Sequence, residues 1–321
     1  MTGFDQKDLE GNVGMVVLEK CVLLSLVCSS IGMTKTINSE FVEVSKDGIS
    51  TKTDKKSLKA QKILLRSKRI AKINGIMHKT QGFLRALSIP FTKKITKNGT
   101  YVLPYDLVVQ AVNSIEEAKL EVSQEVQCLI PEYPSLVADS KVSLGDLFNS
   151  DDYPPSDSLA DVFTMEYAVT PLGPPQKLKD MDPDVYEKLK EQAAQRWSDE
   201  INDIQQALRV SFQKLISDVA EKLTSDENGN KKRLRDNMLD KVVYFLDTFN
   251  SRNVGNDSEL SALVAQAREV LSGVDGQVVK SNSKIREEVA TTFASITKTV
   301  NGMIKEDGKR KISFTDEEES E

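Results

Sequence analysis

Two patterns of hydrophobic and polar positions divide the chain. From Met15 to about Thr51, the short β-branched runs MVVL, CVLLSLV, KTI and EFVEVS are separated by SSIG and SKDG. Such runs between turn signals predict short strands, with Leu24, Val27 and Ile31 facing a core. The polar residues 1–12 before them predict a flexible leader.

A helical pattern follows. Asp54 is a suitable N-cap for a helix to about Leu87, in which Gly75 and Gly82 are possible breaks. The next residues predict a β-hairpin, because the sequence KNGT carries the Asn-Gly turn signal between two β-prone runs. A second helix is expected from about Asp106 to Ile130. Its inward residues would be Leu107, Ala111, Ile115, Ala118 and Val122.

Residues 131–181 contain seven of the ten prolines. Proline removes a backbone donor and disrupts helices, so this segment is predicted to be an irregular connector. It would hold one strand, Val162–Pro171. The strands, helix, hairpin and second helix before it would form a first domain at residues 13–130.

Residues 182–305 predict a bundle of long helices. Asp182 as cap and Pro183 at the first helical position begin a helix of about 42 residues. Its apolar positions repeat every eleven residues, which gives a nearly straight stripe that other helices must cover. The repeat includes Tyr186, Trp197, Leu208 and Val219. The covering helices would span about Lys231–Arg252, Ser258–Leu271 and Ser283–Met303, and the acidic tail 306–321 would be disordered.

Together these elements predict a mainly α fold with a small β component (α+β). The aromatic content of 6% also favours helix packing. The apolar run Val13–Met33 is interrupted by Glu19 and Lys20, so its uncharged part is too short to span a bilayer. We therefore expect a cytoplasmic protein without membrane contact. The odd number of cysteines, three, predicts reduced core thiols.

Candidate chemistry is sparse in the sequence. The chain has one histidine, His78, and lacks a phosphate-binding glycine loop, a nucleophile elbow and paired zinc-ligand cysteines. We accordingly expect a non-enzymatic protein without a cofactor or metal.

The most informative feature is a basic block. Between Asp54 and Asp106 there is no acidic residue and there are thirteen lysines and arginines, although the whole chain has a net charge of −6. One interpretation pairs these cations with the acidic outer face of the second helix. The other is nucleic-acid binding, since phosphates would select against acidic residues there. The predicted contacts are Lys55, Lys56, Lys59, Lys62, Arg66, Lys68, Arg69, Lys72, Lys79, Arg85, Lys93, Lys94 and Lys97, with Phe91 and Tyr101 stacking on bases of preferably single-stranded DNA.

Over residues 15–275 the chain resembles a bacterial family, borne by phages and plasmids, that is known only as domain of unknown function 3150. The similar pieces are CVLLSLVCSSIG, the basic helix ending in FLRALSIP, the strand FTMEYAVTP and the helix RWSDEINDI. The resemblance implies no known activity, but the genes of the family's members lie near genes for ring-forming ATPases of the chelatase type and von Willebrand-like proteins, which implies an assembly role. We expect a homo-oligomeric nucleic-acid-binding protein of a phage or mobile element; the alternative is an adaptor subunit that docks on a ring ATPase or other assembly.

Overall fold

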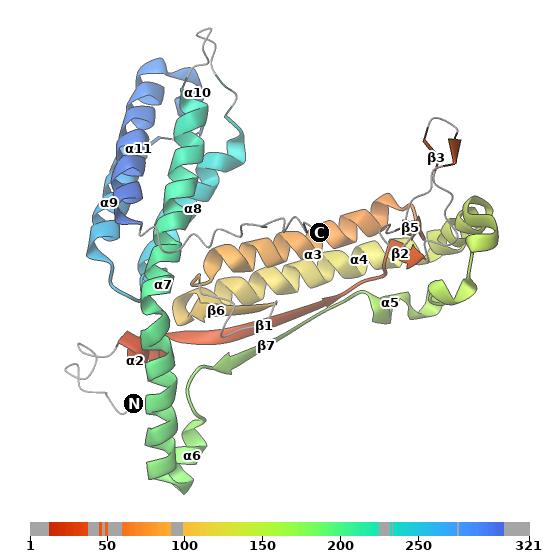
Figure 1. Cartoon of the computed structure of the whole chain (residues 1–321), viewed down its shortest axis with the longest axis horizontal. Helices are drawn as coiled ribbons and strands as arrows, with labels where there is room; N and C mark the ends of the chain where they lie inside the picture. Colours follow the sequence, from red (N-terminus) through yellow and green to blue (C-terminus); the bar gives the residue numbers. More distant parts are fainter. Residues whose placement is uncertain are drawn as a thin grey trace, which may run out of the picture. The chain divides into compact units, whose positions relative to one another are not determined.

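The computed structural model describes residues 13–37, 45–46, 49–50, 60–90, 99–224, 232, 234–274 and 276–304 (Figure 1). The fold is mainly α with a small β component, as predicted. The chain divides into two compact units. Unit 1 comprises Met1–Leu24, Arg85–Val108 and Val169–Glu321, and unit 2 comprises Ser25–Leu84 and Val109–Ala168. These boundaries differ from those predicted, because each unit is assembled from separate stretches of sequence.

The helices are α2 (Val13–Lys20), α3 (Lys68–Leu87), α4 (Tyr105–Leu144), α5 (Leu159–Val162), α6 (Gln176–Met181), α7 (Pro183–Leu223), α8 (Asp236–Arg252), α9 (Ser258–Val270), α10 (Gly276–Ser281) and α11 (Ser283–Met303). The strands are β1 (Cys21–Ser29), β2 (Thr34–Ile37), β3 (Ser45–Lys46), β4 (Ile49–Ser50), β5 (Ala60–Ile63), β6 (Thr100–Pro104) and β7 (Thr164–Pro171). One sheet has the order β6-β1-β7. The antiparallel pairs β2–β5 and β3–β4 form the other two sheets.

The predicted first strand is wrong, because MVVL belongs to helix α2. Gly14, Val17 and Leu18 are all buried, and this spacing of three and four residues is helical. The prediction for strand β1 is confirmed. Leu24 and Ile31 are buried as expected, but Val27 is 65% exposed, since an odd step along a strand reverses the side of the sheet.

Helix α3 begins at Lys68, and the predicted start at Asp54 lies outside the described residues. The helix cannot run unbroken from there, because residues 60–63 form β5 and pair with β2. The Ser67 hydroxyl accepts a hydrogen bond from the Ile70 amide at 3.3 Å, which caps the first turn. Gly75 and Gly82 do not break the helix.

The start of the predicted hairpin, residues 91–98, lies outside the described residues. Its second arm is strand β6, and the Ile89 amide donates to the Val102 carbonyl at 2.9 Å. Gly99 has φ of 86°, a conformation that glycine adopts without steric cost.

Helix α4 is longer than predicted and continues through Pro131 and Pro134 to Leu144. The connector prediction is therefore wrong for residues 131–144, although β7 lies where expected. Leu129 and Tyr133 keep the buried face of the helix continuous across the prolines. This packing offsets the local cost of the prolines, and irregular 3-10 turns begin only at Gly145.

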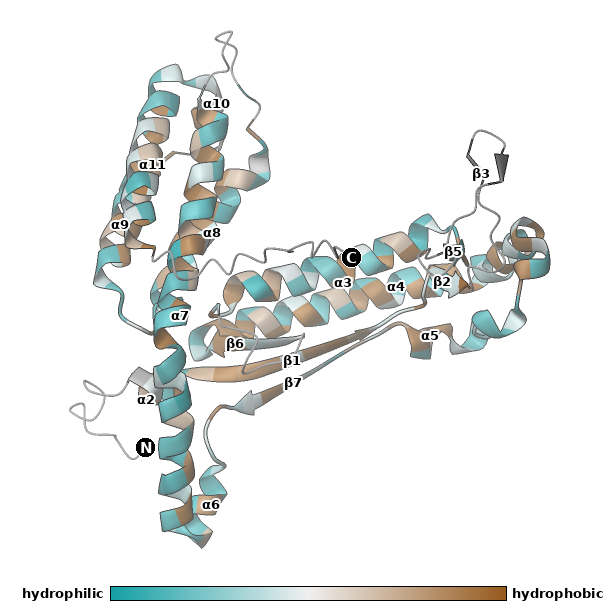
Figure 2. Ribbon diagram, viewed as in Figure 1, coloured by the Kyte–Doolittle hydropathy of each residue, from teal (hydrophilic) through white to brown (hydrophobic). Residues whose placement is uncertain are grey.

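Unit 1 is built on helix α7, which spans 41 residues. The Asp182 carboxylate accepts a hydrogen bond from the Val185 amide at 3.0 Å, which confirms the predicted cap. Four positions of the eleven-residue repeat, Tyr186, Trp197, Leu208 and Val219, are buried. Helices α2 and α11 both lie along α7, and the unit 1 helices carry hydrophobic and hydrophilic residues on different sides (Figure 2).

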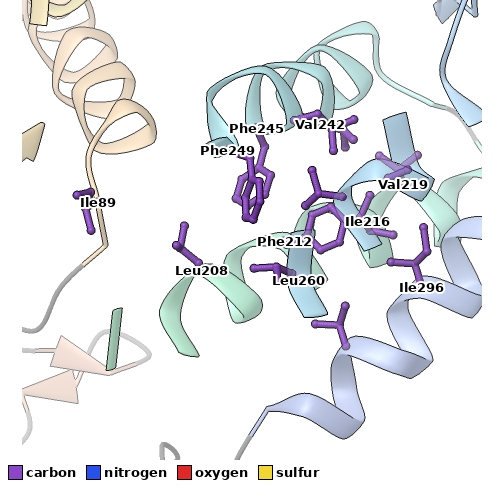
Figure 3. Close-up of a cluster of buried hydrophobic side chains, with 14 of the residues drawn as sticks. Ile89, Leu208, Phe212, Ile216, Val219, Val242, Phe245, Phe249, Leu260 and Ile296 are labelled. Atoms are coloured by element: carbon purple, nitrogen blue, oxygen red, sulfur yellow. The ribbon is translucent and has the colours of Figure 1, made fainter. Parts of the chain in front are cut away.

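Helices α8, α9 and α11 match the predicted covering helices, whereas the short α10 was not predicted. The aromatic rings of Phe212 and Phe245 stack with centroids 5.4 Å apart, and Phe249 lies beside Phe245 (Figure 3). Because aromatic side chains bury large apolar areas, this cluster is the centre of the bundle core.

Arginine side chains tie the helix ends of unit 1 together. Buried Arg286 donates to the carbonyls of Lys222 and Leu223 at 2.7 and 2.9 Å, at the end of α7. Arg209 binds both oxygens of Asp257, the cap of α9, and also reaches the Met303 carbonyl at 2.9 Å. These contacts satisfy carbonyls that a helix end leaves without intrahelical donors.

Two glycine substitutions should have opposite effects on stability. A Cβ on Gly14 would lie 1.8 Å from the Ala194 carbonyl oxygen, so we expect Gly14→Ala to destabilise unit 1 by about 1–3 kcal/mol. A Cβ on exposed Gly75 would meet nothing within 4 Å, so Gly75→Ala should stabilise α3 by about 1 kcal/mol. Denaturant unfolding followed by circular dichroism measures both. Equal effects of the two changes would contradict the described packing.

Candidate nucleic-acid interface

Only part of the predicted interface can be located. The predicted contacts Lys55, Lys56, Lys59, Phe91, Lys93, Lys94 and Lys97 lie outside the described residues. The described members are Lys62, Arg66, Lys68, Arg69, Lys72, Lys79, Arg85 and Tyr101. They fall into three groups: cations paired within the chain, exposed cations, and one buried aromatic residue.

Lys62 is a structural residue. Its side chain is 8% exposed, and its ammonium lies 2.6 Å from Asp152 and 2.7 Å from the Leu147 carbonyl. Lys35 binds the other oxygen of Asp152. Hydrogen bonds from Lys35 and Lys62 hold the pKa of Asp152 below its ordinary value. These contacts join the β2–β5 pair to a 3-10 turn, so the prediction that Lys62 is available to phosphate is wrong.

Arg69 and Lys72 form ion pairs with helix α4. Arg69 lies 2.8 Å from both Glu125 and Glu132, and Lys72 lies 2.7 Å from Glu125. The hydrogen bonds from Lys72 and Arg69 lower the pKa of Glu125. For these two cations, the interpretation that the block pairs with the acidic second helix is confirmed. Lys72 nevertheless keeps 56% of its side chain exposed.

Tyr101 cannot stack on a base in this structure. The residue is 5% exposed, and its neighbours Val102 and Leu103 in strand β6 are completely buried. The stacking prediction for Tyr101 is therefore wrong, because the aromatic ring belongs to the core.

Arg66, Lys68, Lys79 and Arg85 are exposed, and no carboxylate of the described residues lies within ion-pair distance of them. Arg85 begins the next stretch of unit 1, whereas the other three belong to unit 2. Arg66 shares with Asp139 the lining of a cleft of about 410 Å³.

At about 100° per residue, one side of α3 carries Lys68, Lys72, Gly75, Lys79 and Gly82. We call this side the α3 ridge. Its glycines are exposed, and a Cβ built on either meets nothing within 4 Å. The ridge is therefore a line of cations with little side-chain bulk between them. The sequence pattern was interpreted as possible helix breaks at Gly75 and Gly82, and the open surface between the lysines was not predicted. The two glycines within a helical pattern could have indicated it.

Other candidate chemistry is limited in the described residues. His78 is exposed. The described structure has no group of three or more potential metal-ligating His, Cys, Asp or Glu side chains. Burial raises the pKa of the Cys21 thiol to about 12, which fits a core residue, but Cys128 is exposed and contradicts that prediction. Within the described ranges, every helix is too short or too polar to cross a bilayer.

Comparison with family models, curated proteins and solved structures gave no match. The resemblance to domain of unknown function 3150 therefore stays a prediction.

The Asp152 contacts predict a pH-dependent stability of unit 2. Its pKa in the folded state lies below the ordinary value of 3.8, so its ion pairs stabilise the fold above that pH and are lost as pH falls further. The difference in thermal midpoint between wild type and Asp152→Asn should be largest at neutral pH and should decrease below about pH 4. Circular dichroism across this pH range measures it. Exposed Asp157→Asn is the control, and a difference for Asp152→Asn that is independent of pH would contradict the assignment.

Proposed function

We propose that the protein binds nucleic acid through phosphate contacts made by the α3 ridge. The observation that carries the proposal is that Lys68 and Lys79 remain exposed and without a carboxylate in ion-pair range within the described part of the chain. Helix α3 contains five cations and no acidic residue. Selection against acidic residues on this helix is what a polyanionic partner would produce.

The spacing of the ridge lysines suits a phosphate backbone. Lys68 and Lys72 are about 6 Å apart along the axis, and Lys72 and Lys79 about 10 Å apart, at 1.5 Å per residue. Gly75 and Gly82 leave the helix surface between the ammonium groups open to close approach. Contacts of this kind recognise the charge of the backbone and carry no base sequence information.

The buried Tyr101 changes the expected ligand. Of the two aromatic residues predicted to stack on bases, Tyr101 is buried and Phe91 lies outside the described residues, so the preference for single-stranded DNA rests on Phe91. We therefore propose backbone binding to single or double strands.

The neighbouring α4 carboxylates will limit the affinity. Glu125 is bound to the ridge residue Lys72, and Glu132 is bound to Arg69 beside the ridge. The charge of Glu121 also acts on Lys72. The local excess of positive charge is therefore small. Binding should be moderate and strongly weakened by salt, because surface charges are screened within about 10 Å at ordinary ionic strength.

The test is fluorescence anisotropy with labelled single- and double-stranded DNA at several salt concentrations, using nuclease-treated protein. We expect Lys68→Ala with Lys79→Ala to weaken binding and to reduce the salt slope by about 1 for each lysine. The control is Lys177→Ala with Lys214→Ala, which removes two exposed lysines of unit 1 and should leave the slope unchanged. Absence of binding at low salt, or equal losses in the two variants, would exclude the ridge as the interface.

A second candidate, an adaptor that docks on another protein such as a ring ATPase, is favoured by an apolar stripe in unit 1. Val185 and Leu189 are four residues apart at the start of α7 and are 42% and 41% exposed, and Met181, the last residue of α6, is 76% exposed. Apolar side chains gathered on an exposed helix face are typical of helix docking.

This candidate is tested by co-purification with a co-expressed ring ATPase in the presence of nuclease. Val185→Ser with Leu189→Ser should reduce the captured ATPase while helix content is unchanged. The exposed Val243 of α8 provides the control as Val243→Ser, which should not affect capture. Capture that disappears with nuclease alone would favour nucleic-acid binding instead.

A further inference from the structure

Unit 2 carries opposite charges on two adjacent helices. Helix α3 has five cations and no acidic residue. Helix α4 has seven acidic residues and two lysines. Both helices are packed through apolar faces, for example through Ile73 and Ile115, which are completely buried. Their charged faces therefore lie at the surface of one unit, with opposite sign.

The two helices neutralise each other only in part. The ion pairs between α3 and α4 in the described structure involve Arg69 and Lys72 on one side and Glu125 and Glu132 on the other. Closer to the start of α4, Glu117 and Glu121 are exposed, and no described cation lies within ion-pair distance of either. On α3, Lys68 and Lys79 are likewise exposed, and no described carboxylate lies within ion-pair distance of either lysine. Charges of both signs thus remain available on the same unit.

The acidic face of α4 also presents a large apolar side chain. Leu120 is 62% exposed and lies between Glu117 and Glu121 in sequence. On the α3 ridge, Gly75 lies between Lys72 and Lys79 in sequence and adds no side chain to the surface. The acidic face of α4 therefore has an exposed leucine beside carboxylates, whereas the α3 ridge has exposed glycines beside lysine ammonium groups.

We propose that these two faces bind each other between copies of the chain. Glu117 and Glu121 of one copy would pair with Lys68 or Lys79 of the next, and Leu120 would pack over the Gly75–Gly82 strip. A second copy is the partner that the charge complementarity identifies, because every copy carries both faces. Two copies can pair both faces reciprocally as a two-fold dimer, or one face of each copy can bind the next copy and build a ring or an open chain.

Self-docking uses the α3 ridge that the proposed function assigns to phosphate, so an adjacent copy and nucleic acid compete for it. The carboxylates of α4 take the place of phosphates when the protein is alone. Nucleic acid added to the assembled protein should therefore separate the copies. The docking does not require the proposed function to hold, because it is measured without nucleic acid.

Sedimentation velocity of nuclease-treated protein tests the docking. Two charge-reversed chains are needed, one with Lys68→Glu and Lys79→Glu and the other with Glu117→Lys and Glu121→Lys. We expect the wild type to increase in mass with concentration at low salt and to return to single chains at high salt. Each reversed chain alone should stay single, because its two faces repel. An equimolar mixture should regain association, because one chain then offers two acidic faces and the other two basic faces.

Control measurements separate misfolding from loss of docking. Circular dichroism must show wild-type helix content in both reversed chains, and Leu120→Ser provides a neutral variant that should weaken association without changing net charge. A wild type that stays single at every concentration overturns the proposal, as do reversed chains that associate alone or a mixture that stays single. Anisotropy on the same samples reports nucleic-acid binding separately, so failure of docking and failure of the proposed function give different results.

Discussion

Burial of one continuous stripe on helix α7 is the constraint on which unit 1 depends. A helix of 41 residues with apolar residues every eleven positions cannot leave that stripe in water, and no single short helix covers it. Helices α2 and α11 therefore lie along α7, and Phe245 and Phe249 of α8 fill the space beside Phe212. The arginine contacts at helix ends follow from the same arrangement, because helix termini that meet inside a bundle must have their carbonyls satisfied.

In unit 2 the distribution of charge matters more than its total. Some cations of the basic block have structural partners: Lys62 with Lys35 on Asp152, and Arg69 with Lys72 on Glu125. Each of these pairs lies between elements distant in sequence, where partial burial reduces screening. The cations left on the α3 ridge are fewer than the block suggests, and they are arranged along one line. A line of cations can bind a phosphate backbone or a row of carboxylates. The proposed nucleic-acid binding and the proposed docking between copies therefore use the same lysines and differ in the negatively charged partner.

The predictions that succeeded depended on local physics. The cap at Asp182, the length of α7 and its buried repeat follow from side-chain periodicity and from capping within a few residues. Strand β7 and the helices α9 and α11 were also located from local patterns. The errors occurred where a distant segment overrode a local signal. Pro131 and Pro134 were taken as the end of a helix, but the buried residues on both sides keep α4 continuous.

The sequence by itself determined the mainly α class, the rod-like α7 and the absence of acidic residues from the basic block, because composition and periodicity are properties of neighbouring positions. Only the tertiary structure decided which cations are available, because an ion pair depends on distance in space. Arg69 and Glu132 are 63 positions apart in sequence and make two hydrogen bonds, while Lys68, next to Arg69, remains exposed. Helical periodicity places these two neighbours on different sides of α3, but which side meets the α4 carboxylates is decided only by the packing of segments distant in sequence.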